Sequence, residues 1–148
     1  HDALHPGGVN LKPLAFEKIA VEAVGKVLVE HQVPAEDIGF VTQLILATDF
    51  ELVGDLHNQL TGFSEDQTVP LVLRASILLT EADILPSVLP IYGEHLATQL
   101  SSEWKKAGVT TREDPVLPEA RKNFLGRVRF SSPHAAQLGI RELISAQL

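Results

Sequence analysis

Cysteine and methionine are both absent from this chain of 148 residues, and each absence narrows the possibilities. Without cysteine, the chain can form neither a disulfide framework nor a catalytic thiolate, and a bound metal must use nitrogen and oxygen ligands. The lack of disulfides fits a cytoplasmic protein. Without methionine, His1 is not a translation start, so we expect that a segment upstream of this sequence is missing from it.

Long apolar runs and basic clusters are missing as well. The most hydrophobic stretch, residues 71–85, contains Arg74, Glu81 and Asp83 and does not reach the roughly 20 apolar residues that a membrane-spanning helix needs. The formal net charge is −7, and the basic residues form no cluster longer than a Lys-Lys pair or an Arg-Val-Arg triplet. We therefore expect neither a membrane nor a nucleic acid as partner. A small phosphate compound bound through metal ions stays compatible with this charge.

Helical periodicity is present along nearly the whole chain, with apolar residues recurring at three- and four-residue spacing. Gly108 follows one such segment as a C-cap candidate, and Ser132 precedes another as an N-cap candidate. The sequence predicts a single all-α domain of about six helices over residues 1–148, truncated at its N-terminus. The expected helices cover residues 14–32, 36–47 with a continuation or bend toward 60, 70–83, 91–108, 118–130 and 132–148.

His1, Asp2 and Asp83 carry the strongest signal for metal binding. The adjacent His1 and Asp2 could both reach one ion, and the carboxylate could bridge to a second, harder cation. Asp83 follows the most apolar segment, where burying an unpaired carboxylate is costly. Two alternatives stay open at this point: the His-Asp pair can arise by chance, and Asp83 can be a solvated residue at a helix end.

The remaining polar candidates are weaker when each is taken alone. Thr48 and Asp49 end an apolar helix and Glu17 lies between core-facing residues, so a solvated helix position is the simpler interpretation for all three. Three histidines show no ligand-like spacing and are expected at the surface or in loops. They are His57, His95 and His134.

Six blocks along the chain form a recognisable series: HDALHPGGVN, LAFEKIAVEAVGKVL, VTQLILATDFELVGDL, VLRASILLTEADI, EHLATQLSSEWKKAG and AAQLGIRELI. In order and approximate spacing, the series resembles class I cyclic nucleotide phosphodiesterases, which belong to the HD-domain metallophosphohydrolase superfamily. The chain departs from the family where Lys18, Ile19 and Ala20 replace Asn-His-His, and where Thr80 replaces a histidine.

The resemblance implies an HD-domain-like helical bundle that hydrolyses a phosphoester of a small nucleotide-like substrate, with a 3′,5′-cyclic nucleotide as one option. It implies a zinc-like ion together with magnesium or manganese as cofactors. One further metal-binding histidine and the general acid would come from the upstream segment. By position, the metal ligands would be His1, Asp2 and Asp83, the catalytic residues Asp2, His5, Glu17 and Thr48, and the substrate-binding residues Gln137 and Asn10.

Two other interpretations remain. The chain could be a non-catalytic HD-like helical module used in signalling or protein association, which is favoured by Ile19, Ala20 and Thr80 at positions that are polar in the family. It could also be a helical bundle in which the His-Asp pair is accidental.

Overall fold

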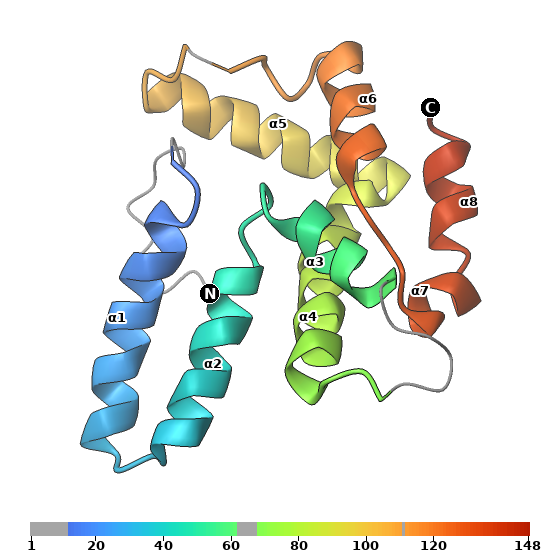
Figure 1. Cartoon of the computed structure of the whole chain (residues 1–148). Coiled ribbons are helices and arrows are strands. Elements are labelled where there is room, and N and C mark those ends of the chain that lie inside the picture. The colour runs from blue at the N-terminus through green and yellow to red at the C-terminus, as the bar shows by residue number, and fades with distance from the viewer. Residues whose placement is uncertain (1–11, 62–67, 111) are drawn as a thin grey trace. The chain divides into compact units, whose positions relative to one another are not determined.

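The computed structural model describes residues 12–61, 68–110 and 112–148. These residues form helices and no strand, so the all-α prediction is confirmed for this part of the chain (Figure 1). The helices are α1 (Ala15–Glu30), α2 (Ala35–Ala47), α3 (Val53–Thr61), α4 (Leu71–Val88), α5 (Pro90–Lys106), α6 (Pro118–Arg127), α7 (Pro133–Gln137) and α8 (Ile140–Ser145).

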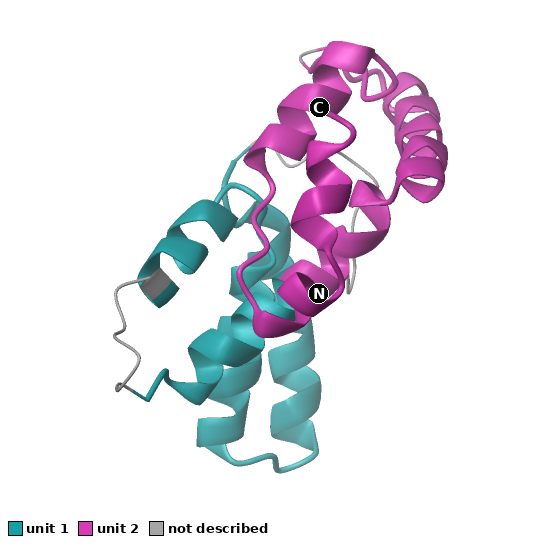
Figure 2. Cartoon of the chain, turned by 90° about the vertical axis from the view of Figure 1, so that its right-hand side faces the viewer, with its two compact units in different colours: residues 1–6, 10–80 teal, residues 7–9, 81–148 magenta. Residues whose placement is uncertain are grey.

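The chain divides into two compact units, and each is described by itself (Figure 2). Among the described residues, the first unit extends to Thr80 and the second begins at Glu81. Helix α4 therefore contributes its first half to one unit and its second half to the other.

In the first unit, α1 and α2 form an antiparallel helical hairpin (Figure 1). Residues 31–34 reverse the chain, with Gln32 in the left-handed region at φ 57°. The amides of His31 and Val33 donate hydrogen bonds to the carbonyls of Val27 and Leu28, at 3.1 and 3.0 Å. Because carbonyls in the last turn of a helix have no intrahelical partner, these bonds give α1 a defined end.

The second unit is organised around the C-terminal end of α4. The sequence predicted an end near Asp83, but α4 continues through Pro86 to Val88. Two side chains satisfy its last carbonyls: Arg121 donates to the Ser87 carbonyl, and Gln147 Nε2 donates to the Val88 carbonyl at 2.8 Å. Partners far along the chain thus replace the intrahelical bonds that this end lacks. Burial lowers the pKa of the Arg121 guanidinium, which stays charged because arginine titrates far above neutral pH.

More helices are present than the six or so predicted, because two expected helices are divided. Gly139 lies in the left-handed region at φ 64°, which glycine adopts readily, and it separates α7 from α8. The expected continuation of α2 toward residue 60 is a separate helix, α3, because the chain turns at residues 48–52. The predicted glycine stop after α5 is confirmed, since Gly108 has φ 68°.

Gly93 on α5 lies where a side chain would collide with the end of α4. A Cβ atom there would lie 2.3 Å from the Ser87 carbonyl oxygen and 2.6 Å from Arg121 Nη2. We predict that Gly93→Ala lowers the free energy of unfolding by about 2 kcal/mol, because relief of this overlap must disturb the bonds that cap α4. Urea unfolding followed by circular dichroism measures the change.

The matched control is Gly126→Ala on α6, where an added Cβ meets no atom within 4 Å. This variant should keep or slightly raise the stability, because alanine restricts the unfolded chain. Equal losses in the two variants would contradict the steric explanation.

Candidate functional site

The predicted site residues fall into three groups. One group lies outside the described residues: His1, Asp2, His5 and Asn10. Glu17 and Thr48 belong to the first unit, whereas Asp83 and Gln137 belong to the second.

Asp49 joins the beginning of α1 to the end of α2. Its side chain is only 4% exposed, so the expectation of a solvated helix end is wrong for this residue. Oδ2 accepts a hydrogen bond from the Leu14 amide, and Oδ1 accepts one from the Glu51 amide at 2.9 Å. Leu14 is the N-cap residue of α1 and has no side-chain acceptor of its own. Asp49 therefore supplies, from a distant position, the acceptor and the negative charge that favour a helix N-terminus.

The same contact places two predicted catalytic residues at one end of the hairpin. Glu17 lies in the first turn of α1, and Thr48 is the C-cap residue of α2, adjacent to Asp49. Both side chains are partly buried. The Thr48 hydroxyl donates to the Ile45 carbonyl at 2.8 Å, and its oxygen can still accept a hydrogen bond. The antiparallel hairpin thus brings Glu17 and Thr48 to one end from different helices.

Glu81 holds the start of α7 against α4, a role that the sequence did not indicate. Its side chain is 6% exposed. Oε1 accepts hydrogen bonds from the amides of Ser131 and Ser132 at 2.6 and 2.8 Å, and Oε2 accepts one from the Ser132 hydroxyl. Ser132 Oγ in turn accepts from the Ala135 amide at 3.1 Å, which confirms the predicted N-cap. One feature of the sequence could have pointed to this role: Glu81 is an acidic residue inside the most apolar segment, and a carboxylate that is buried there needs hydrogen-bond donors.

Asp83 and Gln137 lie on the two helices that Glu81 connects. Asp83 is two residues beyond Glu81 on α4, and Gln137 is the last residue of α7; both side chains are exposed. The alternative interpretation of Asp83 is therefore confirmed in its solvent exposure, but its position at the helix end is wrong, because α4 continues to Val88. The connection through Glu81 fixes the helix of the predicted base-binding residue to the helix of the predicted metal ligand.

Within residues 12–61, 68–110 and 112–148, no group of three or more histidine and acidic side chains could hold a metal ion. Of the three predicted ligands, only Asp83 belongs to this part of the chain. An ion at Asp83 would therefore need further donors from outside these residues, and His1 and Asp2 are the predicted ones. Imidazole and carboxylate donors suit zinc, manganese and magnesium, so the chemistry of this donor set fits the implied ions.

The three isolated histidines differ from one another in burial. His95 and His134 are exposed, as predicted. His57 is only 4% exposed on α3, so its predicted surface position is wrong. It lies on the same short helix as the buried Val53, one turn further along, and shares its inward face.

No protein-family model matches the chain, and no curated protein or solved structure is significantly similar to it. Among the helices that the structure describes, none combines the length and the apolar character needed to cross a membrane.

We predict that Glu81→Ala lowers the free energy of unfolding by about 3 kcal/mol, because it leaves the amides of Ser131 and Ser132 without their buried acceptor. Glu81→Gln should cost less, since the amide keeps one acceptor oxygen. Urea unfolding gives the energies, and amide hydrogen exchange at Ser132 and Ala135 reports whether the start of α7 has loosened.

The control is Glu119→Ala, a change of the same chemistry in the first turn of α6, where the side chain is 74% exposed. It should change stability by less than about 0.5 kcal/mol. If Glu81→Ala costs no more than this control, Glu81 does not hold α7.

Proposed function

We propose that the chain belongs to the catalytic domain of an HD-type, metal-dependent phosphohydrolase that acts on a phosphoester of a small nucleotide-like substrate. Six motif blocks in the family's order support the proposal, and the all-helical fold agrees with it. The structural observation that carries it furthest is the Glu81 connection between the helix of Asp83 and the helix of Gln137. A hydrolase of this kind needs a metal ligand and a base-binding residue on elements that are held together.

Each residue would have a role that follows from its chemistry. His1, Asp2 and Asp83 would hold the ions, which when bound would activate water and stabilise negative charge on the phosphoryl oxygens. Glu17 and Thr48, at one end of the α1–α2 hairpin, would accept and donate hydrogen bonds that orient ligands and water, as would His5.

The substrate would be recognised by side-chain amides. Gln137 is exposed on α7, and its amide offers both donors and an acceptor, as the edge of a nucleobase requires. Asn10 offers the same groups near the His-Asp motif in the sequence. A 3′,5′-cyclic nucleotide is one substrate that combines a base with a phosphodiester.

A specific observation favours the second candidate, a non-catalytic helical module. Ala20 and Thr80 stand where the family has histidines, and they are 0% and 1% exposed. The Thr80 hydroxyl donates to the Ile77 carbonyl at 2.9 Å, so it is bound to its own helix. These two positions therefore contribute to packing and offer no ligand at the surface.

The test measures metal content and hydrolysis together on the full natural chain. Elemental analysis is combined with assays on bis-p-nitrophenyl phosphate, p-nitrophenyl phosphate and 3′,5′-cyclic AMP in the presence of zinc, magnesium or manganese. We predict that a chelator abolishes turnover, and that Asp83→Asn lowers kcat by about 100-fold or more together with the metal content.

Asp37→Asn is the control, because it removes the same charge from an exposed position in the first turn of α2. It should leave metal content and turnover unchanged. Metal binding without turnover on any phosphoester would favour the non-catalytic module, and turnover that survives both chelation and Asp83→Asn would refute the proposal.

A further inference from the structure

One face of α1, in the first unit, carries an ordered row of residues that the hairpin does not use. The helix packs against α2 (Figure 1), and its one buried residue is Ala20. Successive residues of a helix are rotated by about 100°, so the row lies about 140° around α1 from Ala20. Its members are Ile19, Glu22, Lys26 and Val29, and we call them the α1 seam.

The α1 seam is exposed to solvent along its length. Ile19 and Val29 are 42% and 64% exposed, although both side chains are large and apolar. Glu22 and Lys26 are exposed as well and form an ion pair at 2.8 Å. At Gly25, beside the middle of the seam, an added Cβ atom would meet no described atom within 4 Å. A partner can therefore reach this face without any rearrangement of the hairpin.

The spacing of the seam is that of a surface on which two helices pair. Its members are separated by three, four and three residues, as are the positions that meet in a coiled coil. Apolar residues occupy the two end positions, and residues of opposite charge occupy the two middle positions. Polar residues in the middle of such a surface specify the register and orientation of the helices at some cost in stability.

Two copies of the seam complement each other when the helices run antiparallel about a two-fold axis beside Val24. Ile19 then lies opposite Val29 of the second copy, and Glu22 lies opposite Lys26 of the second copy. The axis repeats both pairings, so apolar side chains meet at each end and opposite charges meet twice in the middle. In a parallel, in-register pair, each charge would face its own kind, which is unfavourable. The charges therefore select the antiparallel arrangement.

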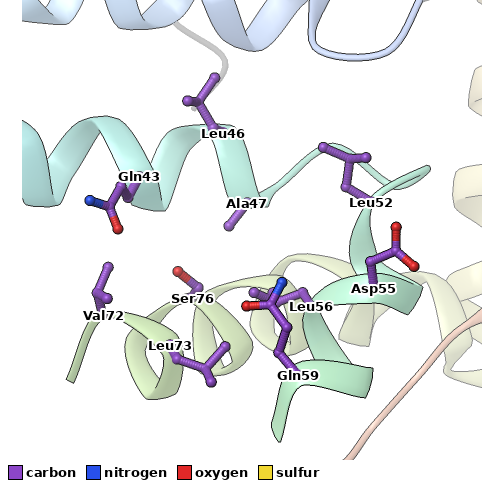
Figure 3. Close-up of a pocket in the computed structure, with 10 residues that line it drawn as sticks. All are labelled: Gln43, Leu46, Ala47, Leu52, Asp55, Leu56, Gln59, Val72, Leu73 and Ser76. Atoms are coloured by element: carbon purple, nitrogen blue, oxygen red, sulfur yellow. The ribbon is translucent and has the colours of Figure 1, made fainter. Parts of the chain in front are cut away.

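We propose that the α1 seam is the contact surface of a homodimer in which two copies of α1 pair antiparallel. The 16 residues of α1 span about 24 Å, so the contact is small and the association weak. The pocket between α2, α3 and the first half of α4 is lined by no residue of α1 and stays outside this contact (Figure 3). The seam contains none of the residues assigned to phosphoester chemistry. The proposal therefore stands independently of the proposed function.

Sedimentation equilibrium at chain concentrations up to about 1 mM tests the proposal, and we predict a monomer–dimer equilibrium. Glu22→Lys and Lys26→Glu each place like charges opposite one another in the middle of the seam. Each variant alone should therefore self-associate about tenfold more weakly than the wild-type chain. An equimolar mixture of the two variants should associate within about threefold of the wild-type affinity, because opposite charges then face each other at both middle positions.

Two exposed valines of α1 provide a matched comparison of the seam with the surface beside it. Val29 belongs to the seam, whereas Val27 lies about 120° around the helix from its middle. Val29→Ala should weaken the dimer by about tenfold, because the two-fold axis removes two apolar contacts at once. Val27→Ala should leave the affinity unchanged. Circular dichroism checks that each variant keeps the helical content of the wild-type chain.

Four results would overturn the proposal. They are a chain that stays monomeric at about 1 mM, equal losses of affinity in Val29→Ala and Val27→Ala, a dimer that persists unchanged in both charge variants, and a mixture of these variants that associates no better than either alone.

Discussion

The buried carboxylate of Glu81 sets the arrangement of the C-terminal helices. A carboxylate that is 6% exposed would be costly to bury without partners, but two backbone amides and one hydroxyl donate to it. Ser132 is both a donor to Glu81 and the N-cap of α7, so the bonds that satisfy the carboxylate also start the helix. The position of Gln137 at the end of α7 depends on this contact, and with it the proposed recognition of a nucleobase.

The same solution recurs at other helix ends, which need partners because their last amides or carbonyls have none within the helix. In the first unit, Asp49 at the end of α2 accepts from the Leu14 amide at the start of α1. In the second unit, Arg121 and Gln147 donate to the last carbonyls of α4, and they bind each other at 2.9 Å. In each case one polar side chain ties together segments that are far apart in the sequence.

The sequence alone determined what depends on neighbours within about one helical turn. Helical periodicity, the Ser132 N-cap and the glycine stop after α5 are local patterns, and the structure bears out all three. The tertiary structure alone decided the burial of Asp49 and Glu81, because a carboxylate enters the interior only where donors from elsewhere in the fold meet it. Those donors lie 35 and 51 positions away, at Leu14 and Ser132, where no local pattern can reveal them.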